Sequence, residues 1–362
     1  MKKFVLISIA ALGVFAACSK NELISASSSD EQIKFETAVN KSTKALINGT
    51  AYATTNTFGT VAYKVNGADT QLYIPVSEVS YTAGTPAYWS TAAPYYWPKQ
   101  GTLTFYSYSP FSYQETAGGE IAVAADENGL KFADYNVADH QLTDLMTAEK
   151  QSGLSASNAS EAGLKDGVKT VFHHKLAQVV AINFETVLDG SLHDYANGHT
   201  AATSSAASTL EAGDKVFIIN KVELKNIKET ATLTCNGVDA STWGSYGTAT
   251  PTVAWHNNAD SKAFEAGKYD TTCDVNGYRL VLPQTHEAGA QNIYFEYTIR
   301  TYTDGTNYAE EKLNYTAEFK ALQESWEQNK RYTYTFKIGL DRIYWVPSVV
   351  DWVDETVAGP TI

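Results

Sequence analysis

A cysteine near the amino terminus has the sequence context of a covalently modified thiol. Cys18 closes the tetrapeptide Phe-Ala-Ala-Cys, which resembles a bacterial lipobox, where the cysteine takes a diacylglycerol. Two lysines and an apolar run over residues 4–17 precede it, a pattern typical of a signal peptide. The pattern predicts cleavage after residue 17 and lipidation of Cys18. Ordinary secretion with an incidental cysteine is the alternative.

Cys235 and Cys273 are the other two cysteines of the chain. An oxidising envelope would allow one disulfide between them. A Cys-rich metal site needs closely spaced pairs, which these two positions do not provide. We therefore expect one pair that could form a disulfide, and no metal bound by these thiols.

The seven histidines and the carboxylates show no spacing that identifies a catalytic centre. The sequence contains no His-Glu-x-x-His, Gly-x-Ser-x-Gly or phosphate-loop motif. His173 and His174 are adjacent, so on a strand they would point to opposite faces. His193 and His199 bracket an expected loop without a third ligand nearby. The sequence therefore predicts no enzyme, no metal and no cofactor.

The composition restricts the class of protein. The 362 residues include 27 basic and 40 acidic side chains, a net charge of −13 that lacks the basic footprint of a nucleic-acid-binding protein. Charged residues make up 19% and hydrophobic residues 44%, which excludes a disordered chain and a multispan membrane protein. With 23 Tyr and 14 Phe against 2 Met, the composition favours strands.

Alternating apolar and polar residues predict half-buried strands of antiparallel sheets. The clearest runs cover residues 293–299, 313–319 and 332–340, and no helix of three turns is expected. Shorter strands are expected over residues 58–65, 103–108, 176–184, 216–224 and 279–282.

Two stretches rich in Ser, Ala, Thr and Gly interrupt the alternation, at residues 152–166 and 197–213. The first is the expected domain boundary because strands flank it on both sides, and the second is an expected exposed loop. The sequence thus predicts two β-sandwich domains in tandem. The expected parts are a signal peptide (1–17), a flexible tether (18–32), an N-terminal domain (33–165), a C-terminal domain (166–346) and a tail (347–362).

A group of aromatic residues lies among prolines and comprises Tyr88, Trp89, Tyr95, Tyr96 and Trp97. Such a group could form a flat platform on which sugars stack. Anchoring of loops over a sandwich core is the preferred interpretation, because aromatic side chains dominate core burial.

Several segments, taken together, resemble the fimbrillin-like family, the pilins of type V fimbriae of Gram-negative bacteria. The matching pieces are Cys18 with its lipobox, Tyr96-Trp97-Pro98, residues 103–110, Asp144–Ala148, Phe172–Ala177, Leu282-Pro283-Gln284, Trp326, Asn329, Tyr332, Tyr334 and Trp352. The resemblance implies two transthyretin-like, immunoglobulin-like β-sandwich domains and a structural subunit without an active site. It also implies an outer-membrane surface location, other pilin subunits as partners, outer-membrane lipid bound through Cys18, a maturation protease, and a surface glycan or protein as a target of adhesion.

The resemblance further implies that a protease cuts after a basic residue and releases the first strand. The groove that this strand leaves empty then receives a strand from a neighbouring subunit. Ile33 and Phe35 alternate with polar residues as a first strand would. The expected cut lies between Lys44 and Ala45, with Lys41 as a competing position.

The carboxyl-terminal tail carries the apolar residues expected of a donor strand: Val349, Val350, Trp352 and Val353. Pro347 is the expected hinge that lets this segment leave its own domain. The alternative is that the segment completes its own domain as a last strand. For the part before Pro347, this alternative is favoured. A rival interpretation of the whole chain is an outer-surface lipoprotein that binds glycans.

Overall fold

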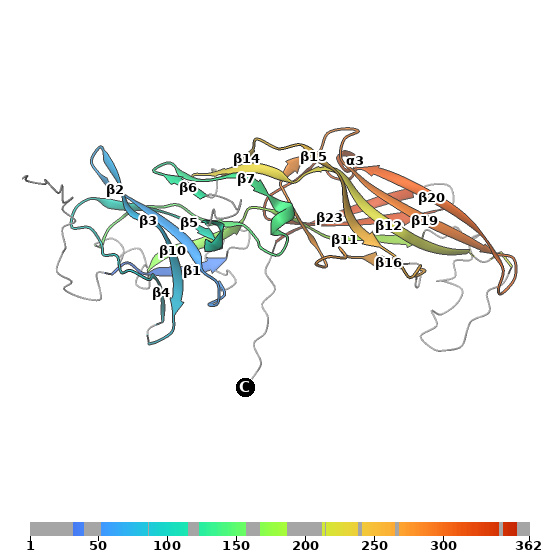
Figure 1. Ribbon diagram of the computed structural model, residues 1–362, viewed down its shortest axis with the longest axis horizontal. Coiled ribbons are helices and arrows are strands. Elements are labelled where there is room, and N and C mark those ends of the chain that lie inside the picture. Colours follow the sequence, from blue (N-terminus) through green and yellow to red (C-terminus); the bar gives the residue numbers. More distant parts are fainter. Residues whose placement is uncertain are drawn as a thin grey trace, which may run out of the picture.

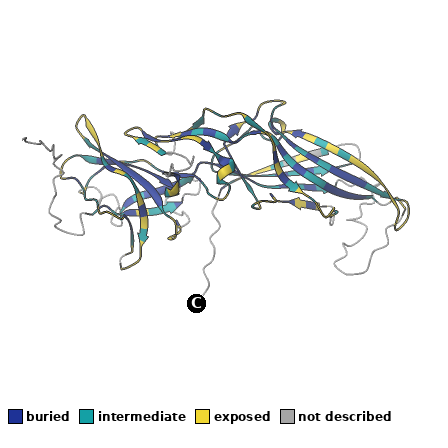
Figure 2. Cartoon of the chain, in the orientation of Figure 1, coloured by how far each residue is buried: buried dark blue, intermediate teal, exposed yellow. Residues whose placement is uncertain are grey.

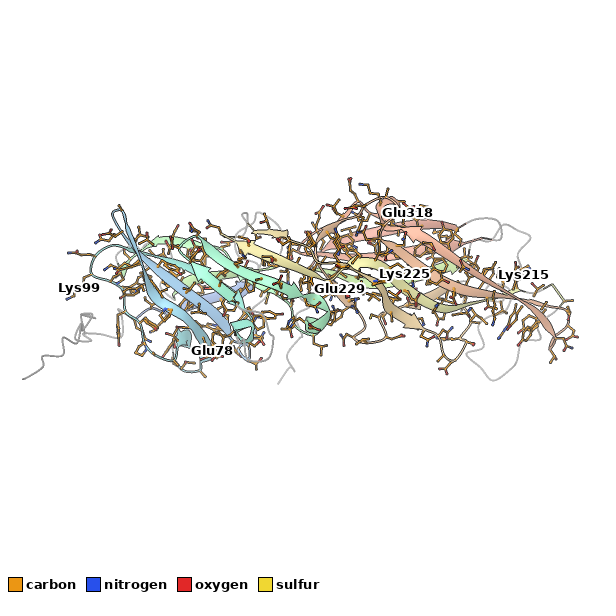
Figure 3. All side chains as sticks on the ribbon, turned by 45° about the horizontal axis from the view of Figure 1, so that its top comes forward. Glu78, Lys99, Lys215, Lys225, Glu229 and Glu318 are labelled. Carbon is orange, nitrogen blue, oxygen red and sulfur yellow. The ribbon has the colours of Figure 1, made fainter. Side chains whose placement is uncertain are left out.

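The computed structural model shows an elongated molecule with N-terminal strands at one end and C-terminal strands at the other (Figure 1). Lys99 and Lys215 lie toward opposite ends, with Glu229 between them (Figure 3). The structure describes residues 32–39, 52–85, 87–114, 123–156, 167–186, 212–213, 215–237, 241–264, 268–339 and 343–352. The all-β fold expected from the alternation is confirmed, and the α-helix α3 (Phe319–Leu322) is a single turn.

The N-terminal end is one eight-stranded sheet that closes on itself. Its strands are β1 (Phe35–Val39), β2 (Phe58–Asn66), β3 (Asp69–Thr82), β4 (Tyr88–Thr91), β5 (Thr102–Ser109), β8 (Met146–Ala148), β9 (Gln151–Leu154) and β10 (Val168–His174). The order is β2-β3-β4-β1-β10-β8-β5-β9. An additional pairing of β2 with β5 closes the first seven strands of this order into a ring, and β9 pairs with β5 beside it. Because every strand turns alternate side chains inward, the ring encloses an apolar core that includes Phe35, Phe58 and Phe172.

A four-stranded sheet lies in the middle of the molecule (Figure 1). It contains β6 (Val123–Asp126), β7 (Gly129–Asn136), β13 (Thr230–Cys235) and β14 (Ser241–Gly244), in the order β14-β13-β7-β6. Its core combines residues from both halves of the chain, such as Tyr108 and Phe132 with Leu233 and Leu282. Buried residues therefore continue from one end of the molecule to the other (Figure 2).

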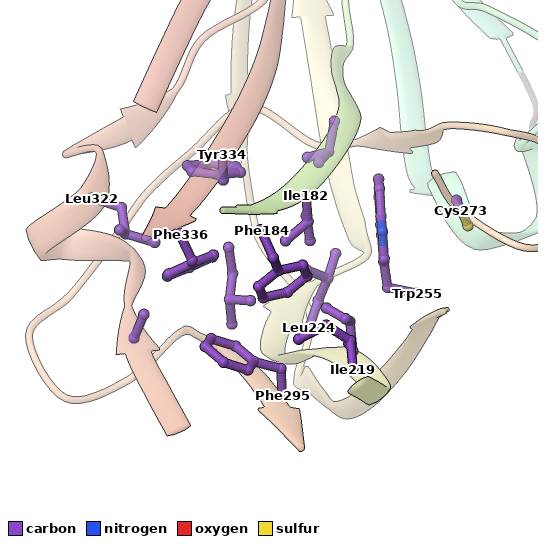
Figure 4. Close-up of a cluster of buried hydrophobic side chains, with 14 of the residues drawn as sticks. Ile182, Phe184, Ile219, Leu224, Trp255, Cys273, Phe295, Leu322, Tyr334 and Phe336 are labelled. Atoms are coloured by element: carbon purple, nitrogen blue, oxygen red, sulfur yellow. The ribbon is translucent and has the colours of Figure 1, made fainter. Parts of the chain in front are cut away.

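Two sheets face each other at the C-terminal end. One contains β11 (Ala177–Thr186), β16 (Lys268–Thr271), β17 (Arg279–Val281), β22 (Lys330–Ile338) and β23 (Ile343–Asp351). The other contains β12 (Lys215–Lys228), β15 (Ala249–Asn257), β19 (Asn292–Tyr302) and β20 (Tyr308–Glu318). The side chains of Phe184 and Phe295 meet between the sheets with ring centroids 4.9 Å apart (Figure 4), as in a sandwich core.

Short elements complete the described chain. They are the 3-10 helices η2 (Phe111–Gln114) and η3 (Val137–His140) and the two-residue strands β18 (Gln284–Thr285) and β21 (Ser325–Trp326). The side chain of Gln141, just after η3, joins the halves: its Nε2 donates to the Leu280 carbonyl at 2.9 Å and its Oε1 accepts from the Leu280 amide at 2.9 Å. A buried ion pair between Arg279 and Glu229 lies at the same junction.

The chain passes between the two ends more than once. β10 comes after the segment expected to be the domain boundary, yet its partners are β1 and β8. β13 continues from β12 in the C-terminal half, yet it pairs with β7. The boundary at residue 165 stays a prediction, and strands from both sides of it share sheets.

Candidate assembly site

The first described strand fills the N-terminal core with alternate side chains. Ile33, Phe35 and Val39 are buried, whereas Glu36 between them is exposed. This period of two is the reason the segment forms a strand with one apolar face. The Ile33 amide donates to the Tyr95 carbonyl at 2.8 Å, so the segment is already fixed before β1 begins.

The two edges of β1 differ in how many of its residues pair with a neighbouring strand. Along one edge, all of Phe35–Val39 pairs in parallel with Val168–Phe172 of β10. Along the other edge, the pairing with β4 consists of Phe35 opposite Trp89. β1 therefore closes the ring mainly through its apolar side chains and through β10.

Gly167 lets β10 approach the start of β1. Its φ of +134° lies in a region that favours glycine, and an added Cβ would lie 2.6 Å from the backbone of Lys34. Directly after it, the Val168 amide donates to the Lys34 carbonyl at 2.6 Å. A side chain at residue 167 would push these two backbones apart.

Phe35 and Tyr52 contact the same aromatic ring. Phe35 packs edge-on against Phe58 with centroids 5.7 Å apart, and Tyr52 packs edge-on against Phe58 at 6.0 Å. The Tyr52 hydroxyl forms a 2.7 Å hydrogen bond with the Ser109 hydroxyl and donates to the Thr57 carbonyl at 2.9 Å. Burial raises the pKa of Tyr52 to about 12, despite the hydrogen bond to Ser109. Tyr52 is thus firmly attached to the ring on the C-terminal side of the expected cut.

The last described strand, β23, lies at the edge of its sheet. It pairs antiparallel with β22 from Ile343 opposite Ile338 to Asp351 opposite Lys330. Val349 is 40% exposed and Val350 is 56% exposed. Pro347 lies within β23, which is consistent with the tolerance of proline in edge strands. Residues 343–351 therefore complete their own sheet in this structure. This alternative was favoured for the part before Pro347, and in the structure the pairing continues past Pro347 to Asp351.

Trp352 attaches the end of β23 to the N-terminal ring. Its side chain is buried and stacks on the ring of His174 with centroids 4.3 Å apart. The Trp352 amide donates to the Asn329 carbonyl at 3.0 Å. His174 itself is hydrogen-bonded through Nδ1 to the carboxylate of Asp144. Sequence patterns give no signal for this contact, because its partners are far apart in the chain.

His173 and His174 have separate partners, as their adjacent positions on a strand predict. His173 Nε2 lies 3.3 Å from Glu149 Oε1, and burial lowers the pKa of His173, partly offset by Glu149. His174 faces Asp144 and Trp352 instead. Among the described residues, no group of three or more His, Cys, Asp or Glu side chains could hold a metal ion.

Cys235 and Cys273 are both free and buried, so the disulfide considered from the sequence is not formed in this structure. They belong to different hydrophobic clusters, Cys235 to the middle one and Cys273 to the C-terminal one. Cys235 Sγ lies 3.2 Å from the Thr147 hydroxyl. Each thiol acts as a small core residue.

The aromatic group between residues 88 and 97 is anchored to the N-terminal core, as preferred from the sequence. Trp89 belongs to that core, and Tyr95 and Trp97 pack against it. The ammonium of Lys34 lies 4.6 Å from the centre of the Tyr88 ring.

Several predicted site residues lie outside the described residues: Cys18, Lys41, Lys44, Ala45, Val353, His193 and His199. Lipidation, cleavage and the far end of the donor segment therefore stay predictions. Within the part of the chain that the structure describes, no helix is long and apolar enough to span a membrane.

The fold defines an all-β protein of several sheets, closed at one end and built as a two-sheet sandwich at the other. The sequence matches the fimbrillin-like family over residues 43–352, and the chain belongs to that family. A fimbrial protein from Bacteroides vulgatus has a similar structure, with 15% identity, a TM-score of 0.56, and coverage of 89% of this chain and 99% of that chain.

The tip fimbrial protein Mfa3 from Porphyromonas gingivalis, with a C-terminal truncation, matches with 10% identity, a TM-score of 0.36, and coverage of 82% of this chain and 94% of that chain. No curated protein matches the sequence. Membership of the family supports the role of a fimbrial subunit at the cell surface, which is a structural rather than a catalytic class of protein.

Proposed function

We propose that this chain is a structural subunit of a type V fimbria that is exported as a lipoprotein and assembled by strand exchange with other pilin subunits. Acylation of Cys18 would hold the precursor in the outer membrane, where a protease matures it. The fimbria would support adhesion, to a surface glycan or protein, or biofilm formation. The observation that carries the proposal is the position of β1, a strand of five residues that fills the ring core just before the expected cut.

Cleavage between Lys44 and Ala45, or after Lys41, would separate β1 from Tyr52. Ile33, Phe35 and Val39 would then be held in the ring only by the packing of their side chains and by the backbone pairing of β1 with β10. Complete burial of each such side chain is worth about 1.5–3 kcal/mol. Loss of β1 would leave an apolar groove and an unpaired strand edge, which favours the binding of a replacement strand.

The carboxyl-terminal segment has the side chains for that replacement. We assign the donor role to Val349, Val350, Trp352 and Val353, which would have to leave β22 and His174. Exposed apolar residues on an edge strand support this role, because such an edge is a template for pairing with another chain.

The donor segment and the acceptor groove lie on different surfaces of a subunit. A contact between two such surfaces does not form a closed pair, so it repeats from subunit to subunit and extends a filament. Deletion of residues 349–362 should leave a folded monomer that cannot polymerise, with β content checked by circular dichroism and filaments by electron microscopy. Added to full-length protein, the truncated chain should stop growth, because it can accept a strand but cannot donate one. Filaments formed by the truncated chain alone would contradict the donor assignment.

A further inference from the structure

The place that Phe35 occupies in the N-terminal ring is an aromatic subsite. Phe35 is 1% exposed and packs edge-on against two rings, with centroids 5.7 Å from Phe58 and 5.9 Å from Phe105 and interplanar angles of 83° and 88°. Aromatic rings prefer such edge-to-face contacts, which contribute beyond the area that they bury. An aliphatic side chain would fill the space without forming either contact. The subsite therefore favours an aromatic side chain.

The two walls of the aromatic subsite have contacts of their own, apart from β1. Phe58 of β2 lies 5.8 Å from Trp89 and 5.3 Å from Phe172, and Phe105 of β5 lies 6.0 Å from Trp97, each between ring centroids. β2 and β5 also pair with each other. Both strands follow the expected cut in the sequence, so they would stay in the mature subunit. Release of β1 would thus empty the subsite and leave its walls in place.

The backbone beside the subsite is held on both sides. The Ile33 amide donates to the Tyr95 carbonyl at 2.8 Å, and the Lys34 carbonyl accepts from the Val168 amide at 2.6 Å. Among the described residues, β1 beyond Phe35 pairs only with β10, and this pairing is parallel. An incoming strand would therefore be placed by backbone bonds at the same point as by its aromatic side chain. This point sets the register of the strand.

An incoming strand that matches residues 33–35 needs an aliphatic residue inward, a polar residue outward and an aromatic residue inward. Ile33 and Phe35 are each 1% exposed, and Lys34 between them is half-buried. Residues 350–352 of the donor segment, Val-Asp-Trp, have this order. The order runs from the amino end in both segments, so the match requires a donor strand parallel to β10, as β1 is.

A second pair of residues in β23 has the same spacing but a different position. Ile343 and Trp345 are an aliphatic and an aromatic residue two positions apart. They precede Pro347 and lie opposite Ile338 and Phe336 of β22. Residues 350–352 instead lie at the end of the ladder, where they can leave while the earlier pairs stay formed.

We propose that Trp352 of a second copy of this chain enters the aromatic subsite, with Val350 in the place of Ile33. This inference rests on the strand exchange proposed above and names the residue that sets its register. In its own chain, Trp352 is buried against the ring of His174 at 4.3 Å between centroids. Transfer to the subsite would exchange one buried aromatic environment for another, so the donor loses little by leaving.

Fluorescence anisotropy of labelled peptides tests the proposal. The acceptor is the full-length chain cut once between Lys44 and Ala45, and the probe is a peptide of residues 343–362. Trp352→Phe in the peptide should retain binding, because the subsite holds a phenyl ring in this structure. Trp352→Leu should bind about tenfold more weakly, because two aromatic contacts are lost. Trp345→Leu is the matched control and should bind as the parent peptide does.

A change in the acceptor locates the contact. Phe105→Leu removes one of the two aromatic walls, so the difference between the parent and Trp352→Leu peptides should shrink from about tenfold to about threefold. Circular dichroism checks that this variant folds, and the peptide series on the parent acceptor decides the matter if it does not. Mass spectrometry of the displaced fragment shows that the peptide takes the place of β1.

The outcomes separate this proposal from the strand exchange on which it rests. Equal binding of the parent and Trp352→Leu peptides, with β1 displaced by both, would overturn the subsite and leave strand exchange intact. Weakening by Trp345→Leu in place of Trp352→Leu would overturn the register in the same way. Failure of every peptide to displace β1 would overturn both proposals.

Discussion

Trp352 and His174 stack with their rings almost parallel, 5° apart in orientation and 4.3 Å between centroids. His174 ends β10, the strand whose earlier residues pair with all of β1. One strand therefore holds both the segment expected to be released and the end of the segment expected to donate. In the proposed assembly, β10 is where the first and last strands of a subunit are attached.

Trp352→Ala should loosen β23 without disturbing the ring. Truncation of a buried tryptophan costs about 3 kcal/mol, and each 1.4 kcal/mol is a tenfold change. Amide exchange in the β22–β23 ladder should therefore become about 100-fold faster, measured by hydrogen–deuterium exchange. Val350→Ala, at a position 56% exposed, should leave the exchange nearly unchanged. Equal effects of the two changes would show that Trp352 does not anchor the strand.

Phe35→Ala should destabilise the N-terminal ring, because Phe35 is buried against Phe58 and Phe105. The expected loss in the free energy of unfolding is about 4 kcal/mol, measured by denaturant titration. Glu36→Ala, on the exposed face of the same strand, should cost less than about 0.5 kcal/mol. A small effect at Phe35 would mean that β1 contributes little to the core it occupies.

Gly167→Ala should weaken the attachment of β1 specifically. Gly153 also has a positive φ, +72°, but an added Cβ there meets nothing within 4 Å. We expect the free energy of unfolding of Gly167→Ala to be about 2 kcal/mol lower than that of Gly153→Ala. Both changes strain a backbone with positive φ, but only a Cβ at residue 167 would also clash with the backbone of Lys34. Thermal unfolding of the two variants measures the difference, and equal stability would contradict the close approach.

Stability should fall in alkali, partly through Tyr52. The folded chain retains the Tyr52 proton to a pKa of about 12, whereas the ordinary value is 10.0. The stabilisation is thus fully present below pH 10 and is lost as the pH rises from 10 to 12, by about 1.4 kcal/mol per pH unit. Tyr52→Phe should reduce this slope by that amount, measured by denaturant titration at several pH values. An unchanged slope would place the Tyr52 hydroxyl in water.

Local sequence patterns predicted the strands well because side-chain alternation is a property of each strand by itself. β19 and β22 lie where Ile293–Ile299 and Tyr332–Leu340 alternate. Pairing partners depend on contacts between distant residues, which a period of two does not encode. The pairing of β7 with β13 and of β1 with β10 therefore came only from the structure.

The candidate site was predicted to a similar extent. The apolar residues of β1 and of the tail were visible in the sequence, whereas the stack of Trp352 on His174 depends on a contact between residues far apart in the chain.

The amino-terminal sequence of subunits taken from assembled filaments tests the central claim most directly. The proposed strand exchange predicts chains that begin at Ala45, or at Ser42 if the cut follows Lys41, and that lack Ile33–Val39. Subunits that begin at an acylated Cys18 and retain Phe35 would contradict release of β1, and with it the proposed mechanism of assembly.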